Sequence, residues 1–288
     1  DMLCGLVEKY GVVPKEAMPE TAASPATREL VQFMTRKLRE FACVIRKEYE
    51  AGADIDALRK KKDGMMQTIY DMLCIALGPP PASFTFEARS KEDKFIRDAD
   101  ITPLDFYRRY VGWSLGDYVS LINAPTADKP YGKTYTVKML GSVIEGRPVK
   151  YLNLPIGELK NAAIAQMKDG LPVWFGCDVG QSSLRDGGIL DTNALKADEL
   201  FGTTFGMTKA ERLDYGESLM THAMVFQGVN LDENGKPERW RVENSWGDKA
   251  GKDGYYVMSD RWFDEYMYQV VVHKKYLTEE QREQFEQE

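Results

Sequence analysis

The sequence predicts an α+β protein with a helical N-terminal half and an antiparallel, β-rich C-terminal half. Two observations predict this class. Up to about residue 113, apolar residues recur at spacings of three and four, which is typical of amphipathic helices. After that point, short segments rich in β-branched and aromatic residues are separated by turn-forming residues, which is typical of strands. At 288 residues the chain can bury a substantial core, as one large domain or as two lobes.

The helical half contains three predicted helices. Ser24-Pro25 is a typical start for the first, which the sequence Ala-Gly-Ala-Asp at 51–54 ends. Its apolar stripe is Leu30, Phe33, Met34, Leu38, Phe41, Ile45 and Tyr49. The second stripe is Ile55, Leu58, Met65, Met66, Ile69, Leu73 and Leu77, and it ends at Gly-Pro-Pro-Pro. Thr102-Pro103 is expected to cap the third helix.

The β-rich half is predicted to contain eight strands and one clear helix. The predicted strands are residues 120–125, 133–140, 149–154, 172–179, 222–229, 239–246, 254–260 and 268–276. The helix is predicted at 155–170, with Pro155 near its start and Gly170 after its end. A charged stretch at the end of the sequence is predicted to be helical as well.

Charge and cysteine content limit the functional classes. A net charge of −7 disfavours general attraction to nucleic acid or to an anionic membrane, and no apolar run approaches the ~18 residues of a membrane span. The basic run at 59–63 is interpreted as a solvated helix face. The cysteines lie far apart in apolar surroundings, so we expect buried free thiols and a cytoplasmic location.

One short region combines residues that suit nucleophilic catalysis. Alternation places His222, Met224 and Phe226 on one face of a strand, and Asn244 lies on the strand that would return beside it. An amide oxygen that accepts from one ring N–H fixes the tautomer of an imidazole and frees the other nitrogen for proton transfer. Trp246 could cover that hydrogen bond and keep water out.

The His222 and Asn-Ser-Trp-Gly combination resembles the papain-like cysteine peptidases. The segments starting at Asp1, Val173, Glu211 and Arg241 are similar to the bleomycin hydrolase or aminopeptidase C branch over nearly the whole chain. The resemblance implies a partial papain-like fold with a helical insert and a β-barrel-like lobe. It also implies that His222 is the general base and acid, that Asn244 orients it, that Trp246 supports the pair, and that Ala223 borders a substrate pocket.

The resemblance also implies a domain organisation and a set of partners. Residues 1–23 would be the remainder of an N-terminal helical lobe, 24–125 the helical insert and connection, and 126–288 the lobe with the catalytic His and Asn. Substrates would be peptides or amides with a free N-terminus, and the intact protein would be a hexamer. No metal or organic cofactor is expected.

The nucleophile of this family is absent from its expected context. The family carries it in a Gln-x-x-x-x-x-Cys-Trp type segment, at the start of a helix that favours the thiolate. None of Cys4, Cys43, Cys74 and Cys177 has that setting, although Cys177 is expected closest to the site. We therefore expect that the sequence is part of a longer protein that contributes the Cys, and also a C-terminal arm, and that the isolated chain is inactive.

Two other interpretations remain open. The first is a non-catalytic, peptidase-like scaffold or assembly subunit, since the nucleophile is missing and the helical insert could serve assembly. The second is nucleic-acid binding, which we do not expect as the main role because the protein is acidic. A segment with the nucleophilic Cys, encoded directly upstream, would favour the enzyme over the scaffold.

Overall fold

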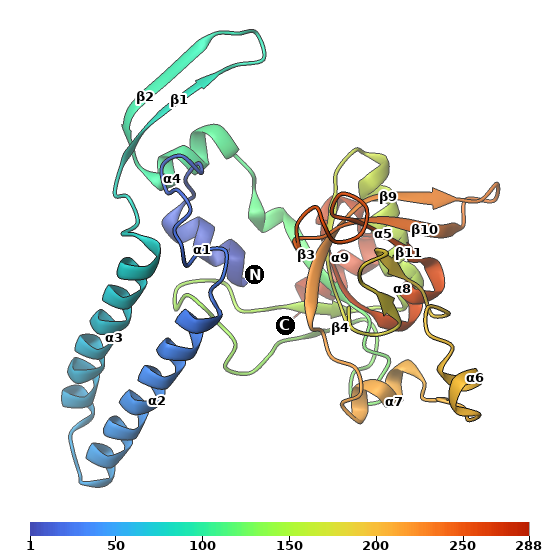
Figure 1. The fold of residues 1–288 in the computed structure, drawn as a ribbon, viewed down its shortest axis with the longest axis horizontal. Helices are drawn as coiled ribbons and strands as arrows, with labels where there is room; N and C mark the ends of the chain where they lie inside the picture. The colour runs from blue at the N-terminus through green and yellow to red at the C-terminus, as the bar shows by residue number, and fades with distance from the viewer. Residues whose placement is uncertain (288) are drawn as a thin grey trace. The chain divides into compact units, whose positions relative to one another are not determined.

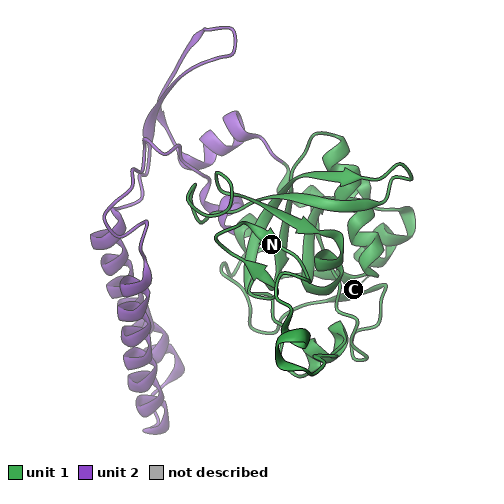
Figure 2. Ribbon diagram, turned by 45° about the vertical axis from the view of Figure 1, so that its right-hand side comes forward, with its two compact units in different colours: residues 1–5, 114–288 green, residues 6–113 purple. Residues whose placement is uncertain are grey.

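The computed structural model describes residues 1–287 and divides them into two compact units. Unit 1 contains residues 1–5 and 114–288, and unit 2 contains residues 6–113 (Figure 2). Figure 1 labels the helices and strands of both units. Among the described residues, no helix is both long enough and apolar enough to cross a membrane.

Unit 2 is built around a hairpin of two long helices. These are α2 (Arg28–Glu50) and α3 (Ile55–Leu77). Asp54 caps α3, because its carboxylate accepts from the backbone N–H groups of Asp56 and Ala57. The predicted start at Ser24 is wrong by a turn: Ser24 hydrogen-bonds within a turn with Thr21, and α2 begins only after Thr27.

Apolar side chains along the α2–α3 hairpin are only partly covered. Neither helix buries a full stripe: α2 has no buried residue, and α3 buries Leu58 and Ile69. A pair of helices has two apolar stripes but only one mutual contact face, so part of each stripe stays exposed. The basic run at 59–63 lies on α3, where Arg59 pairs with Asp56 and Lys61 with Glu48.

The rest of unit 2 includes a β-hairpin that the sequence analysis missed. Strands β1 (Phe84–Arg89) and β2 (Phe95–Ile101) pair in antiparallel fashion. They are followed by α4 (Pro103–Phe106) and the π-helical turn η1 (Tyr107–Val111), and Thr102 caps α4 as predicted. Phe106 packs edge-on against Phe84 and Phe86. The alternation of Phe84 and Phe86 with polar residues was a usable strand signal.

Unit 1 is dominated by one ten-stranded sheet in the order β4-β5-β3-β12-β6-β9-β10-β11-β8-β7. Its strands are β3 (Tyr118–Ile122), β4 (Lys133–Tyr135), β5 (Tyr151–Asn153), β6 (Val173–Cys177), β7 (Ser183–Leu184), β8 (Ile189–Leu190), β9 (His222–Leu231), β10 (Pro237–Glu243), β11 (Tyr255–Ser259) and β12 (Met267–His273). The prediction of a purely antiparallel half is wrong at two pairs. β3 pairs with β5 in parallel, and so does β8 with β11. In each pair, the long segment between the two strands brings the second strand back beside the first in the same direction.

The helices of unit 1 differ in how they pack. α5 (Ile156–Lys168), α8 (Asp260–Tyr266) and α9 (Glu279–Glu286) contact strands of the sheet, whereas α6 (Ala197–Phe201) and α7 (Lys209–Asp214) bury none of their residues. The chain begins with α1 (Met2–Tyr10), and short 3-10 turns form η2 (Leu115–Asp117) and η3 (Lys274–Tyr276). The α5 prediction is confirmed, whereas α6, α7 and α8 were missed. They are short, and a helix of five to seven residues shows less than two turns of periodicity.

The core of unit 1 is a stack of aromatic rings between the sheet, α5 and α8. Phe175 and Phe226 stack at 3.9 Å between ring centroids, and Trp240 stacks on Phe263 at 4.6 Å. All four side chains are fully buried. Each such ring contributes several kcal/mol, of order ~3–5 on truncation to alanine. This rigid core holds β9 and β10 side by side.

Candidate active site

The ends of two paired strands bring the predicted site residues together. His222 is the first residue of β9, and Asn244 directly follows β10. The strands pair in antiparallel fashion, and Asp232 to Lys236 form the turn that joins them. Because this pairing returns the chain to its starting edge, residues 22 positions apart become neighbours.

His222 and Asn244 are joined by a hydrogen bond. The His222 Nε2 atom lies 2.9 Å from Asn244 Oδ1, and the backbone N–H of Ser245 donates to the same Oδ1 at 2.8 Å. A backbone N–H can only donate, so the shared atom is an oxygen. His222 must therefore donate from Nε2, which leaves Nδ1 of the neutral ring unprotonated and able to accept a proton.

Trp246 packs against the imidazole of His222 and is itself contacted by Tyr256 and Arg185. Its ring centroid lies 4.7 Å from that of His222, with a tilt of 32°. Tyr256 meets the indole edge-on at 6.0 Å, and the Arg185 guanidinium carbon lies 4.2 Å from the indole centroid. The indole thus shields the imidazole on one side and limits its rotation. Trp246 was predicted from the sequence, whereas Arg185 was not.

The segment before His222 is tied down by a buried carboxylate that the sequence analysis missed. Asp178 accepts hydrogen bonds from Ser218 Oγ at 3.0 Å, from the Leu219 backbone N–H at 3.3 Å and from Thr221 Oγ1 at 3.2 Å. Asp178 follows β6 directly and is 7% exposed. The carboxylate therefore fastens the entry of β9 to the end of β6. An Asp after a buried strand was the only local signal for it.

Cys177 is the cysteine nearest to the candidate base. It is paired in register with His222 across β6 and β9, as expected from the sequence. It is fully buried, and burial raises the pKa of its thiol, which disfavours the thiolate that nucleophilic attack needs. Cys177 is therefore interpreted as part of the core rather than as a nucleophile.

The other three cysteines lie in helices. All four are free, but the expectation that all are buried is wrong: Cys43 is exposed, and Cys4 and Cys74 are partly exposed. The reason for Cys43 and Cys74 is the incomplete cover of the α2–α3 hairpin. Cys43 and Cys74 lie beyond the first turn of their helices. Cys4 lies in the first turn of α1, where a helix dipole can stabilise a thiolate, but it lacks the Gln-x-x-x-x-x-Cys-Trp context expected from the sequence.

Ala223 lies beside His222 on the sheet. It is half-buried and pairs with Gly176 of β6. Alternation along β9 directs its methyl group to the sheet face opposite to His222 and Met224. Its expected role at a substrate pocket stays a prediction.

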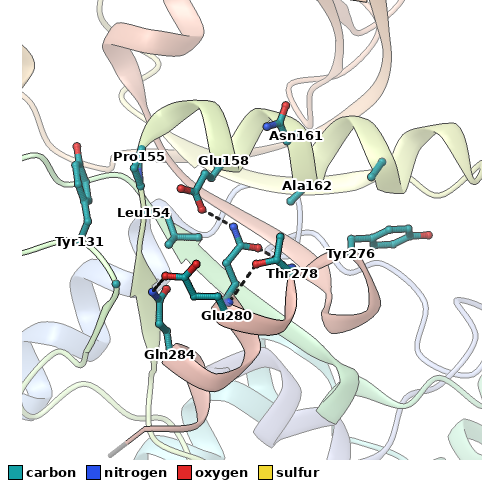
Figure 3. Close-up of a pocket in the computed structure, with 13 residues that line it drawn as sticks. Tyr131, Leu154, Pro155, Glu158, Asn161, Ala162, Tyr276, Thr278, Glu280 and Gln284 are labelled. Carbon is teal, nitrogen blue, oxygen red and sulfur yellow. Dashed lines mark hydrogen bonds between the residues drawn. The ribbon is translucent and has the colours of Figure 1, made fainter.

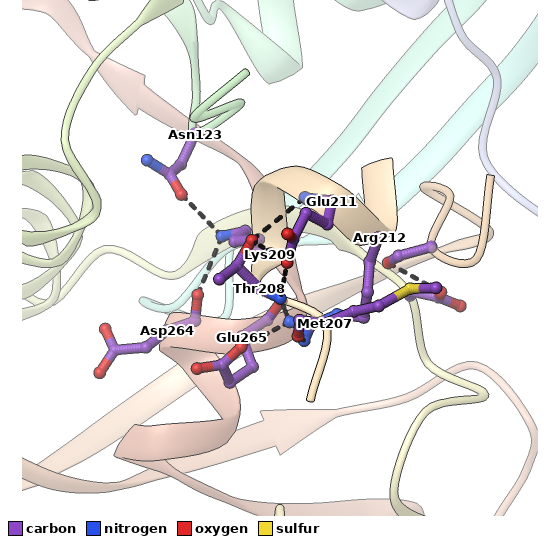
Figure 4. Close-up of polar contacts among 10 residues, drawn as sticks. Asn123, Met207, Thr208, Lys209, Glu211, Arg212, Asp264 and Glu265 are labelled. Carbon is purple, nitrogen blue, oxygen red and sulfur yellow. Dashed lines mark hydrogen bonds and ion pairs between the residues drawn. The ribbon is translucent and has the colours of Figure 1, made fainter. Parts of the chain in front are cut away.

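A second polar cluster anchors α7, which leads into the segment before His222 (Figure 4). Lys209 Nζ donates to Asn123 Oδ1 at 2.7 Å and to the Asp264 backbone carbonyl at 3.0 Å. Arg212 pairs with the Glu265 carboxylate at 2.5 Å. Burial lowers the pKa of Lys209 to about 7, although nearby carboxylates oppose that shift. The cluster positions α7 and offers no nucleophile.

A separate pocket of about 600 Å³ lies between α5 and α9 (Figure 3). Gln281 donates to the Glu158 carboxylate across it, and Gln284 donates to Glu280 at 3.1 Å. Its lining contains neither a histidine nor a cysteine. The geometry for proton transfer is therefore at His222 and not in this pocket. Within residues 1–287, no group of three His, Cys, Asp or Glu side chains has the arrangement of a metal site.

Comparisons with known proteins identify the family of the chain. A model described as the Peptidase C1-like family matches residues 1–288. The chain belongs to this family. It is 52% identical over 286 residues to aminopeptidase C of Streptococcus thermophilus, which covers 99% of this chain and 64% of the relative. It is 43% identical over 293 residues to bleomycin hydrolase of Homo sapiens, which covers 100% of this chain and 64% of the relative.

A solved structure matches as well. The crystal structure of PepW from Lactobacillus rhamnosis HN001 has a TM-score of 0.95 and 54% sequence identity, and the match covers 99% of this chain and 64% of that chain. The predicted papain-like α+β fold is thus confirmed. The chain spans 64% of the length of the relatives that it matches.

Proposed function

We propose that residues 1–288 form the base-bearing part of a cysteine aminopeptidase. The observation that carries the proposal is the 2.9 Å hydrogen bond from His222 Nε2 to Asn244 Oδ1, which directs Nδ1 to a reaction partner. The names of the relatives, aminopeptidase C and bleomycin hydrolase, support peptides and amides with a free N-terminus as substrates. Ala223 would border the pocket for the second side chain of the substrate.

The reaction proceeds through an acyl-enzyme. His222 takes the proton of a cysteine thiol at Nδ1, and the thiolate attacks the carbonyl carbon of the first peptide bond. His222 then gives that proton to the leaving amine as the C–N bond breaks, which leaves a thioester. Water, deprotonated by His222, hydrolyses the thioester and restores the thiol. Asn244 holds the ring in the tautomer and orientation that both transfers need.

The cysteine is proposed to come from a segment outside residues 1–288. None of the four cysteines combines the expected sequence context with a setting that favours attack. Cys177 is buried with a raised pKa, Cys43 and Cys74 lie beyond the first turn of their helices in unit 2, and Cys4, in the first turn of α1, is followed by Gly5 rather than by a Trp. The full-length protein that contains this chain would supply the nucleophile. We also propose a cytoplasmic location, which the four free cysteines support.

The α2–α3 hairpin is proposed as a self-association surface, and a hexamer is the proposed assembly. Large apolar side chains are exposed along both helices: Val31, Phe33, Leu38, Tyr49, Ile55, Met66, Tyr70 and Ile75. Contiguous apolar exposure of this kind is typical of a protein interface. A non-catalytic scaffold would use the same surface, so assembly alone does not distinguish the two functions.

Activity measurements separate the enzyme from the scaffold. In the full-length protein, His222→Ala should abolish hydrolysis of an aminoacyl-coumarin, whereas His273→Ala, which changes the only other histidine, should not. Asn244→Ala should lower kcat by about 10–100-fold, the loss expected for one hydrogen bond to a charged ring. The isolated 288-residue chain should be inactive, with or without Cys177→Ala.

Two results would contradict the proposal. Full activity of His222→Ala would show that the base is elsewhere. Turnover by the isolated chain that disappears in Cys177→Ala would show that Cys177 is the nucleophile after all. A full-length protein without peptidase activity would favour the scaffold.

A further inference from the structure

Arg185 lies in a turn whose backbone is held in place. The turn joins β7 to β8, and the Gly188 N–H donates to the Arg185 carbonyl at 3.2 Å. Gly188 has a φ of +63°, and a Cβ there would lie 2.7 Å from the Gly251 Cα. β8 also pairs with β11, at Ile189 with Val257. The start of the Arg185 side chain is thus fixed next to the loop that follows Trp246.

Among the residues that the structure describes, none provides an anionic partner for the Arg185 guanidinium. It lies over the indole of Trp246, 4.2 Å from the ring centroid, and no described carboxylate lies within 4.0 Å of it. Stacking on an aromatic ring leaves the N–H groups at the edge of the guanidinium free to donate. Asp186 is adjacent in sequence but does not pair with it. The group is therefore an exposed cation with its fork of donors available.

The chemistry of His222 defines which part of a substrate approaches Arg185. The proton for the leaving amine must come from His222, so the leaving part of the peptide begins beside the imidazole. Trp246 contacts the imidazole, and Arg185 contacts Trp246. One extended residue spans only ~3.3–3.6 Å, so the C-terminal carboxylate of a dipeptide or tripeptide lies only one or two residue lengths from the scissile bond. The indole of Trp246 separates His222 from Arg185 by a similar length.

We propose that Arg185 binds the C-terminal carboxylate of short peptides and so makes the enzyme prefer dipeptides and tripeptides over their amides. The inference rests on the proposed function and names a substrate class for it. A guanidinium and a carboxylate form two parallel charge-assisted hydrogen bonds, which a primary amide cannot reproduce. In an acidic protein with a net charge of −7, this cation also offsets the repulsion of an anionic peptide.

The test compares substrates that differ only in the terminal charge. In the full-length protein, kcat/KM is measured for a dipeptide, for its C-terminal amide and for an aminoacyl-coumarin. The unmodified protein should prefer the dipeptide over the amide. Arg185→Gln should lower kcat/KM for the dipeptide by about 10–100-fold, mainly through KM, and remove the preference. Arg185→Lys should keep part of it, because a lysine keeps the charge but loses the fork.

Arg241→Gln is the matched control. Arg241 stacks on Tyr255 at 4.1 Å, a similar contact in which Trp246 and His222 take no part, so its removal should leave the preference unchanged. An equal loss for dipeptide, amide and coumarin in Arg185→Gln would overturn the proposal and assign Arg185 to the packing of Trp246. An unchanged preference would overturn it too. A full-length protein that cleaves no coumarin substrate would refute the proposed function itself.

Discussion

The strand ends around His222, Asn244 and Asp178, here called the sheet edge, and the α2–α3 hairpin are stabilised in opposite ways. At the sheet edge, a fully buried aromatic stack fixes β9 and β10. Asn244 accepts a hydrogen bond that orients His222, and Asp178 accepts hydrogen bonds that hold the entry loop. In the hairpin, no residue of α2 is buried, and large apolar side chains remain exposed. The difference teaches that directed hydrogen bonds and buried packing are concentrated at the proposed site of proton transfer, whereas the hairpin presents exposed apolar surface.

Removal of the Asp178 carboxylate should have the largest effect on the sheet edge. Asp178→Ala leaves the buried Ser218 hydroxyl without its acceptor and also removes the bonds from Leu219 and Thr221, which are exposed residues. This should cost about 1–3 kcal/mol of unfolding free energy. Urea denaturation of the full-length protein would measure this. We also expect kcat to fall by about tenfold, because the strand that begins at His222 loses its anchor.

A nearby carboxylate gives the control for this prediction. Asp186→Ala removes an exposed side chain and should change stability by less than ~0.5 kcal/mol. If both variants lose the same stability, the entry loop does not depend on Asp178, and the contrast between sheet edge and hairpin disappears.

The residues at the sheet edge also show what could be predicted from sequence. His222, Asn244 and Trp246 were predicted because a histidine, an Asn-Ser-Trp-Gly run and a turn between two strands form a specific pattern. Asp178 and Arg185 were missed because each acts across the sheet on residues far away in sequence. Contacts of this kind depend on strand order, and β6 neighbours β9 only in the folded sheet. Similarly, periodicity predicted α2 and α3 well but could not show α6, α7 and α8, which are too short.

The Lys209 anchor should make stability depend on pH, with a smaller effect. Its pKa is about 7 in the native state and about 10.4 when unfolded, so between these values the unfolded state binds one more proton. Stability therefore rises with pH across this window and is lowest where both states are protonated, below pH 7. Relative to Lys209→Gln, we expect the unmodified protein to gain about 2 kcal/mol from pH 7 to pH 9.

The difference in unfolding free energy between the unmodified protein and Lys209→Gln isolates the contribution of Lys209. Other groups that titrate between pH 7 and pH 9 contribute equally to both and cancel. Denaturation curves at pH 6, 7, 8 and 9 would provide the measurement. A constant difference across that range would mean that the ammonium stays protonated in the native state, with Asn123 and Asp264 as sufficient partners.

The smallest effect on stability is expected at the exposed face of the hairpin, where assembly rather than folding should respond. Val31 and Leu38 lie seven residues apart on one face of α2 and are 49% and 43% exposed, so Val31→Ser with Leu38→Ser should change the unfolding free energy of a subunit by less than ~0.5 kcal/mol. If this face binds another copy, the same substitutions should lower the molar mass of the full-length protein in light scattering, because serine removes apolar area from the contact. Glu29→Gln with Lys47→Gln, changes of polar residues on the same helix, would serve as the control. An unchanged mass in the Val31 and Leu38 variant would refute the proposed surface, and a large loss of subunit stability would show that the hairpin is held as tightly as the sheet edge.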